Sequence, residues 1–500
     1  MKHMDTIVAI ATPYGVGGIA VVRLSGPDAF DIADRVWKGR CLSEAASHTA
    51  RLGMITADDS GSPLDQCVAT VFRAPSSFTG EDTVEFSVHG SKWIQRQVVD
   101  RLVSSGARPA EPGEFTRRAF LNGRMDLAQA EGVADLIAAS SRAAHRLAMS
   151  QVTGGFSARI DSLRERLIDL ASLLELELDF SEEDVEFADR ARLRSIAEET
   201  ISMIDRLAAT YASGRAFKEG VPVAIAGRPN AGKSTLLNAL LGEDKAIVSD
   251  IPGTTRDVID DTREIGGILF RFYDTAGLRD TDDEVERIGV GRAHEVIGRA
   301  AIVLWLIDAS ENKKEIVSQI EWIKGQIDAQ INSQSEIYNE AAHLIVFNKT
   351  DLVSDLDSYC HDSHDCHACH ACLDSHACLD AHYSEAIGQL KEVCPGVDVL
   401  QISAKEGKNI GTLETMLVEL AKTGHDPEAE LIITNARHYE ELRSGSKAMH
   451  RVLDALDAGL SADLISQDVR AALHHLGTVT GAVTTDNLLS AIFTRFCIGK

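Results

Sequence analysis

Residues 227–234 combine a glycine-rich turn with a lysine and a hydroxyl group, a set that can hold a phosphate chain. They read GRPNAGKS, fit the spacing G-x-x-x-x-G-K-[ST], and lie between a strand-like run and a helical pattern. The glycines let successive N–H groups face phosphate oxygens, Lys233 reaches the outer phosphates, and the Ser234 hydroxyl can coordinate Mg²⁺. The residues expected to contact a nucleotide here are Asn230, Ala231, Gly232, Lys233, Ser234 and Thr235.

Two later segments supply groups for the metal side of such a site. Asp274 ends the strand-like run LFRFYD and is expected near the metal, while Gly277 offers an N–H to the last phosphate. Thr255, in the run GTTRD, can complete the metal shell when its loop closes. The order of these segments therefore predicts Mg²⁺ and a nucleoside triphosphate.

Two further segments could read the base. Asp351 follows the strand-like run HLIVF and can accept hydrogen bonds from the N1–H and the amino group of guanine. Adenine lacks this donor pair, and such a mismatch costs on the order of 10⁴-fold in selectivity. The run SAK after VLQI can offer N–H groups to the guanine oxygen. We therefore predict GTP, with guanine-side contacts from Asn348, Lys349, Asp351, Ser403, Ala404 and Lys405.

A catalytic glutamine is missing after the DTAG run. Leu278 stands where many GTP-hydrolysing domains carry glutamine, and leucine cannot orient a water molecule. Two side chains could substitute: Asn230 by binding a monovalent cation that neutralises developing charge, and Glu286 by positioning water. The alternatives are that Asn230 only shapes the loop and that Glu286 is one solvated acid among several.

The elements that must position these groups divide the 500 residues into several expected domains. Residues 1–120 mix strand-like and helical runs, and 121–219 are helical. Residues 220–424 alternate strand and helix, and 425–500 are helical again. Because two helical blocks flank the alternating part, we predict a multidomain α/β chain: a mixed α+β domain, then an all-α domain into which a Ras-like P-loop GTPase domain is inserted.

The composition limits the partners and the compartment. The formal net charge of −26 repels phosphate on average, so a nucleic-acid partner needs a local basic patch or a helper protein. The longest apolar run, 301–307, is too short to cross a bilayer, and the N-terminus shows no signal peptide. We therefore expect a cytoplasmic protein that does not contact membranes.

One segment is biased in composition. Residues 360–382 contain five cysteines and six histidines in near-repeats such as CHACHAC. The spacings could bind zinc, but no matching CxxC pair lies elsewhere, which favours a solvated insertion of repeated codons. The other four cysteines are scattered, as expected in a reducing compartment.

The chain resembles the MnmE (TrmE) family of tRNA modification GTPases over nearly its full length. The resemblance is carried, in order, by DTIVAIATP, TGEDTVEF, PGEFTRRAFLNGRMDLAQAEGVADLI, GRPNAGKST, PGTTRD, DTAGLRDTDDEVERIG and the terminal FCIGK. Residues 112–137 and the last five residues are the most specific, because ordinary GTPases lack both. The insertion at about 352–390 departs from the family pattern but leaves both guanine-reading elements intact.

The resemblance implies an activity and partners. It implies a homodimer that hydrolyses GTP in a K⁺-dependent manner and forms a heterotetramer with a MnmG-type flavoprotein. The complex would install an aminomethyl or carboxymethylaminomethyl group at position 5 of the wobble uridine of certain tRNAs. Asn230, Ser249, Ile251 and Thr254 would hold K⁺, and Glu286 would orient water. Further implied nucleotide contacts are Asp250, Pro252, Gly253, Thr275 and Ala276.

The resemblance also implies a folate site in the dimerising N-terminal domain. Its ligand would be 5-formyltetrahydrofolate or a related one-carbon donor, contacted by Arg23, Glu81, Arg124 and Lys500. Many relatives have lysine at Arg124, and a guanidinium has a different shape. Cys497 would lie beside the folate as a catalytic residue, although a cysteine in FCI is commonly a small buried hydrophobe.

Two rival functions remain open. A ribosome-assembly-type regulatory GTPase could share Asn230 and act as a binding switch, but such proteins usually carry a basic appendage, and this chain shows no basic run. A folate-dependent one-carbon transferase regulated by the GTPase overlaps with the leading hypothesis.

Overall fold

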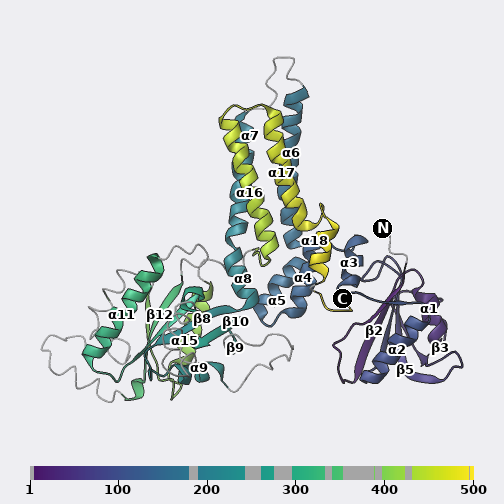
Figure 1. The fold of residues 1–500 in the computed structure, drawn as a ribbon, viewed down its shortest axis with the longest axis horizontal. Helices are drawn as coiled ribbons and strands as arrows, with labels where there is room; N and C mark the ends of the chain where they lie inside the picture. Colours follow the sequence, from purple (N-terminus) through teal and green to yellow (C-terminus); the bar gives the residue numbers. More distant parts are fainter. Residues whose placement is uncertain are drawn as a thin grey trace, which may run out of the picture. The chain divides into compact units, whose positions relative to one another are not determined.

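The computed structural model describes residues 5–179, 190–242, 261–274, 296–332, 341–352, 388, 397–422, 431–494 and 496–499. The chain forms two compact units (Figure 1). The first comprises Met1–Ala138, Ala148–Arg206 and Arg437–Lys500, and the second comprises Ala139–Leu147 and Leu207–Ala436. The chain therefore passes from one unit to the other more than once.

The N-terminal part of the first unit is a sheet with helices on one face. Over the described residues its strands lie in the order β3-β4-β5-β6-β2-β1-β7, antiparallel except for the β1–β7 pair. Helices α1 (Ala29–Val36) and α2 (Lys92–Ser104) bury apolar side chains against it, such as Leu102 on Phe86 and its neighbours. The strands are β1 (Ile7–Ile10), β2 (Ile19–Ser25), β3 (Trp37–Lys38), β4 (Thr49–Thr56), β5 (Pro63–Phe72), β6 (Thr83–His89) and β7 (Arg108–Pro109).

The rest of the first unit is helical. The long helices α6, α7, α16 and α17 lie side by side (Figure 1), and α6 packs against α17 although the sequence places them far apart. This arrangement confirms the predicted all-α domain built from two separate blocks. No helix in the described ranges is long and apolar enough to cross a membrane. The helices are α3 (Glu114–Leu121), α4 (Leu127–Ala138), α6 (Gly155–Asp179), α7 (Arg190–Ala209), α16 (Ala436–Asp457), α17 (Ala462–Thr480) and α18 (Asp486–Phe493). Helix α5 (Arg142–Val152) begins in the second unit and ends in the first.

The second unit contains a mostly parallel sheet in the order β13-β12-β11-β8-β10-β9, as far as the described residues show. Among the strands that the structure describes here, β9 and β10 are the antiparallel pair. Strand β11 reads IVLWLID and is buried throughout, as expected for a strand covered on both faces. The elements are β8 (Val221–Gly227), β9 (Asp261–Ile265), β10 (Ile268–Asp274), β11 (Ile302–Asp308), β12 (Ala342–Asn348), β13 (Asp398–Gln401), α8 (Tyr211–Glu219), α9 (Lys233–Leu241), α11 (Lys313–Asn332), η2 (Thr350–Leu352) and α15 (Ile410–Lys422).

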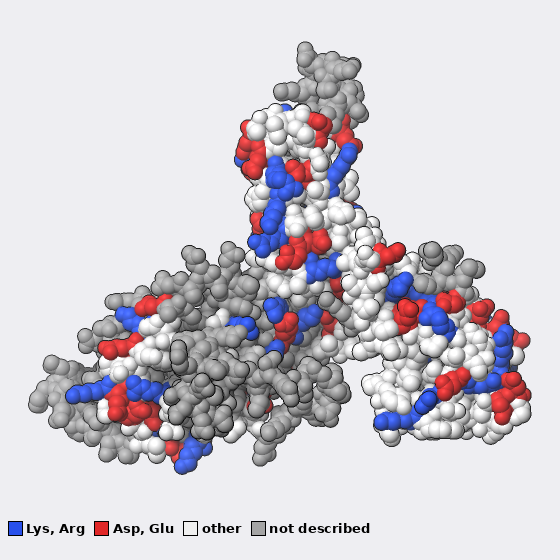
Figure 2. Space-filling model, in the orientation of Figure 1, with Lys and Arg blue, Asp and Glu red and all other residues white. Residues whose placement is uncertain are grey.

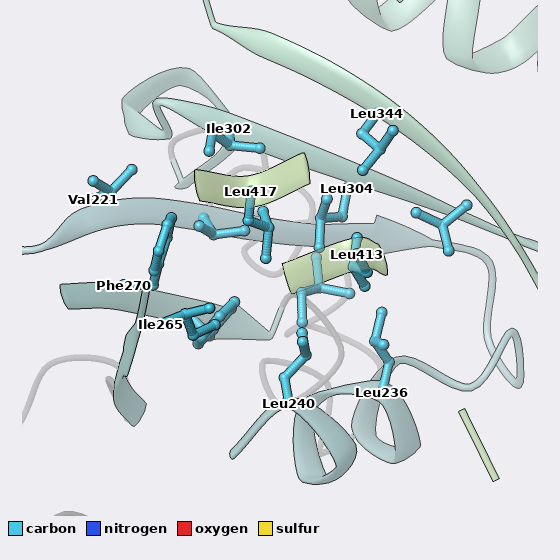
Figure 3. Close-up of a cluster of buried hydrophobic side chains, with 14 of the residues drawn as sticks. Val221, Leu236, Leu240, Ile265, Phe270, Ile302, Leu304, Leu344, Leu413 and Leu417 are labelled. Carbon is cyan, nitrogen blue, oxygen red and sulfur yellow. The ribbon is translucent and has the colours of Figure 1, made fainter. Parts of the chain in front are cut away.

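Apolar layers on the two faces of this sheet hold the strands in register. On one face, Leu236 and Leu240 of α9 and Leu413 and Leu417 of α15 pack on the strands (Figure 3). On the other face, Ile316 and other isoleucines of α11 pack on β11 and β12. Because the parallel strands end at one edge, the loops after β8, β11, β12 and β13 are brought together there. The predicted P-loop domain is thus confirmed, whereas the domain limits drawn from the sequence remain predictions.

A buried histidine in this sheet is expected to make the second unit less stable in acid. His343 accepts a hydrogen bond at Nδ1 from Trp305 Nε1 (3.2 Å), and burial lowers its pKa to about 4. The unfolded chain binds a proton near pH 6.5, so falling pH between that value and about 4 favours unfolding. We expect the denaturant concentration at the unfolding midpoint to decrease as the pH is lowered from about 7 to about 5. The decrease should be smaller in His343→Phe. A variant as pH-dependent as the unmodified chain contradicts this, and the exposed His474→Phe serves as control.

Candidate functional site

The phosphate loop between β8 and α9 has a backbone that requires its glycines. Gly232 has φ 95°, and a Cβ there would lie 2.3 Å from Asn348 Nδ2. At Gly227 a Cβ would lie 2.5 Å from the carbonyl oxygen of Leu306. Asn230 also adopts a left-handed conformation, with φ 66°. The loop therefore packs tightly against the ends of β11 and β12. Glycines without side chains also let the loop backbone come close to phosphates.

Lys233 and the start of α9 give this loop its positive character. The buried Lys233 ammonium donates to the carbonyl oxygens of Gly227 (2.9 Å) and Arg228 (2.8 Å), so it lies over the loop. Gly232 precedes α9, and no described side chain caps that helix end. Its N–H groups and the helix dipole therefore suit an anion. Ser234 and Thr235 are exposed in the first turn, where a hydroxyl can coordinate Mg²⁺.

The guanine-side residues are joined to the phosphate loop by one asparagine. Asn348 is buried; its Nδ2 donates to the carbonyl oxygen of Ala231 (2.9 Å) and its Oδ1 accepts from the Ala404 N–H (3.0 Å). Ser403 Oγ donates to Asp351 Oδ1 (2.6 Å) and so orients that carboxylate. The exposed Lys405 follows in the same loop. The structure thus brings together the groups predicted for phosphate and guanine.

Asp308 belongs to this site although the motifs did not indicate it. It ends β11, and its Oδ2 lies 2.6 Å from Lys349 Nζ. Burial raises the pKa of Asp308, but hydrogen bonds from Lys349 and Ser310 outweigh burial and hold it below the ordinary value. Asp308 therefore stays charged and fixes Lys349, which has φ 64°. The available signal was an acid ending a fully buried strand.

Part of the predicted site lies outside the described residues. Asp274 ends β10 beside Ile225 of β8, so its backbone lies next to the strand that leads into the phosphate loop. Its side chain and the segment 360–382 lie outside the described part of the chain. The other predicted residues outside it are Ser249, Asp250, Ile251, Pro252, Gly253, Thr254, Thr255, Thr275, Ala276, Gly277, Glu286 and Lys500.

In the first unit, the predicted folate residues Arg23 and Glu81 are held by ion pairs and aromatic rings. Arg23 Nε donates to Glu85 Oε1 (2.7 Å), and its guanidinium lies 5.2 Å from the ring centroid of Phe78. Glu81 Oε2 accepts from Ser25 Oγ (3.1 Å) and from Arg118 Nη1 (3.2 Å). A carboxylate, a guanidinium and an aromatic face are groups that can bind a pterin, so this donor set fits a folate.

Sequence reasoning missed Arg118, which orients Glu81. Its side chain is 1% exposed and also pairs with Asp5 (2.8 Å) and Glu114 (2.9 Å). Burial raises the pKa of Glu114, but hydrogen bonds from Arg108 and Arg118 outweigh it and keep the pKa below the ordinary value. From the sequence, the second arginine of the FTRRAF run would be interpreted as a surface charge, but the fold buries it.

The C-terminal tail and Arg124 lie near the same part of the unit. A Cβ at Gly80 would lie 3.1 Å from Arg124 Cγ, so the arginine stem contacts the residue before Glu81. The Gly113 N–H donates to the Cys497 carbonyl oxygen (3.3 Å), and a Cβ at Gly499 would lie 2.1 Å from the Ile10 carbonyl oxygen. Cys497 itself is exposed, which removes the interpretation of a small buried hydrophobe.

Comparisons with known proteins match both the N-terminal domain and the rest of the chain. A model described as the GTP-binding protein TrmE N-terminus matches residues 6–124, and a model of the MnmE helical domain matches 127–497. A tRNA modification GTPase MnmE from Cytophaga hutchinsonii is 45% identical over 500 residues, covering 100% of this chain and 98% of that protein. Proteins of the same name from Bacteroides thetaiotaomicron and Salinibacter ruber are each 45% identical, with 100% of both chains covered.

Proposed function

The chain belongs to the family of the tRNA modification GTPase MnmE, and we propose that it couples GTP hydrolysis to modification of the wobble uridine of certain tRNAs. The product would carry an aminomethyl or carboxymethylaminomethyl group at position 5. The observation that carries the proposal is the Asn348 bridge, which joins the phosphate loop to the guanine-side loop in a chain whose N-terminal part matches the TrmE model.

The residues of the second unit suit the GTPase part of this proposal. Lys233 and the N–H groups of α9 bind the phosphates, and Asp351 selects guanine. Ser234, with Thr255, would hold Mg²⁺, which lowers the charge of the phosphates during hydrolysis. Asn230, Ser249, Ile251 and Thr254 would hold K⁺, and Glu286 would orient the attacking water in place of a glutamine.

The first unit supports a folate site and a homodimer. Arg23, Glu81, Arg124 and Lys500 would bind 5-formyltetrahydrofolate, which supplies a one-carbon unit. On the sheet face opposite α1 and α2, Leu52 and Val68 lie directly opposite each other on β4 and β5 and are 70% and 36% exposed. An exposed apolar pair on a sheet face suits burial against a second copy.

The charge of the chain favours a partner that carries the tRNA. Figure 2 shows Lys and Arg side chains interspersed with Asp and Glu over both the helices and the N-terminal sheet on the face in view. Together with the net charge of −26, this pattern suits tRNA binding that depends on a helper protein. We assign that role to a MnmG-type flavoprotein in a heterotetramer, located in the cytoplasm. The match of residues 6–124 favours this over a ribosome-assembly switch.

Mass spectrometry of tRNA nucleosides after depletion of the protein tests the proposal. We expect the 5-modified wobble uridine to be lost, because the proposed complex would deliver the one-carbon unit to that base. The full-length chain should restore it, whereas a chain truncated after Phe496 should not, since the tail beside Ile10 is lost. Unchanged nucleosides in the depleted cells would exclude the tRNA role.

A further inference from the structure

A buried ion cluster joins the helices α4 and α16 in the first unit. Glu131 accepts from Arg437 Nε (3.0 Å) and Nη2 (2.7 Å), and its Oε2 lies 2.7 Å from His438 Nε2. Burial raises the pKa of Glu131, but the charges and hydrogen bonds of His438 and Arg437 outweigh burial and bring it to about 2. The glutamate is therefore charged and bound by two neighbouring residues of one helix.

The same cluster reaches two further helices. Arg437 also donates to the carbonyl oxygens of Thr478 (2.7 Å) and Val479 (3.1 Å) at the end of α17. His438 is 0% exposed and stacks on Phe156 of α6, with ring centroids 4.9 Å apart. Apolar residues often stabilise a core as well as a buried ion pair does, so this cluster is better explained by the geometry that it imposes than by stability.

The cluster lies where the chain crosses between the two units. Helix α4, which carries Glu131, ends at Ala138, and the next residue belongs to the second unit. Arg437 is the first residue after the chain returns from the second unit at Ala436. The chain also crosses between the units after Leu147 and after Arg206. One carboxylate therefore joins the first of the two segments that leave the first unit to the last segment that returns to it.

The first two turns of α4 also contact the helix that leads to the C-terminal tail. Leu127 and Ala130 pack in one apolar cluster with Leu489, Ile492 and Phe493 of α18. The chain continues from α18 into the tail, whose Cys497 carbonyl oxygen accepts from Gly113. Contiguous contacts thus run from Arg437 through α4 and α18 to the tail.

We propose that Glu131, Arg437 and His438 are coupling residues that carry changes of nucleotide state through α4 to the C-terminal tail. The inference rests on the proposed function, because GTP binding and hydrolysis supply the event to be carried. The three side chains act by position, since their contacts are with one another, α6 and α17. The bidentate Arg437–Glu131 contact makes the N-terminal turns of α4 and α16 move together. Neutralising Glu131 weakens this contact, so the two helices can then move independently.

The test compares the reactivity of the Cys497 thiol in two nucleotide states. The full-length chain is treated with a thiol reagent in GDP or in GDP with aluminium fluoride, both with Mg²⁺ and K⁺, and the Cys497 peptide is quantified by mass spectrometry. We expect the labelling rate to differ about fivefold or more between the states. In Glu131→Gln the two rates should become equal, while GTP hydrolysis stays within about twofold of the unmodified chain.

A matched control exists on the same helix. Glu441 of α16 lies 2.8 Å from His475 Nδ1 of α17, so Glu441→Gln removes a partly exposed glutamate–histidine pair of α16 without changing a residue of α4. It should keep the difference in labelling. Arg437→Lys keeps the charge but loses the two-pronged geometry, and we expect it to behave like Glu131→Gln.

Three results would overturn the inference. One is a Cys497 labelling rate that still depends on the nucleotide in Glu131→Gln. Another is a labelling rate that is the same in both nucleotide states of the unmodified chain. The third is loss of the folded state, seen by circular dichroism, in both Glu131→Gln and Arg437→Lys. The last would assign the cluster a purely structural role. A chain that hydrolyses no GTP would instead refute the proposed function, so the two failures are distinguishable.

Discussion

Asp351→Asn is expected to lower the affinity for GTP by about 10⁴-fold relative to the unmodified chain. The carboxylate, oriented by Ser403 Oγ at 2.6 Å, is expected to accept hydrogen bonds from the guanine N1–H and amino group. An amide presents an N–H to that amino group instead, so one contact becomes a donor–donor clash and a buried group stays unpaired.

Equilibrium titration with fluorescent GTP and xanthosine triphosphate measures this effect. Xanthine carries an oxygen where guanine carries the amino group, so the variant should bind xanthosine triphosphate better than the unmodified chain does. Asp398→Asn, an exposed acid at the start of β13, is the matched control and should leave both affinities unchanged. Equal GTP affinity in Asp351→Asn and the unmodified chain would show that this carboxylate does not read the base.

Asn230→Gly is expected to lower GTP hydrolysis in K⁺ by about 10²–10³-fold, to the rate seen in Na⁺. The side-chain oxygen would hold K⁺, whose charge opposes the charge that develops on the phosphates. Asn230 has φ 66°, a conformation that glycine adopts without strain. The glycine variant therefore keeps the loop shape and removes only the amide.

This substitution separates the two interpretations of Asn230. If the side chain only shapes the turn, Asn230→Gly should hydrolyse GTP like the unmodified chain, with the same preference for K⁺. Asn409, with φ 61°, is another left-handed asparagine of the second unit, and Asn409→Gly should leave the K⁺ to Na⁺ ratio unchanged. Rates measured at several dilutions report whether hydrolysis requires two copies.

The local patterns determined the elements and the identity of the nucleotide. The phosphate loop is read from consecutive residues, and its glycines are required by contacts that any such loop makes after a buried strand. The alternation after residue 220 and the helical blocks on either side predicted an inserted P-loop domain, because burial on one or two faces leaves a periodic trace in the sequence. The Cys/His-rich run and the catalytic loop stay predictions.

Only the tertiary structure decided which charges are buried and what they bind. Glu131 and Arg437 are 306 residues apart, and nothing around either residue distinguishes it from a solvated charge. The same holds for Arg118 beside Glu81. For Asp308 and Asn348 the sequence marked a strand end, but it did not identify Lys349 or the two loops as their partners. A periodic pattern in the sequence indicates which residues of a segment are buried, but it does not indicate which distant residues they contact. Partners are chosen when distant segments pack, because a buried charge must find its counter-charge there.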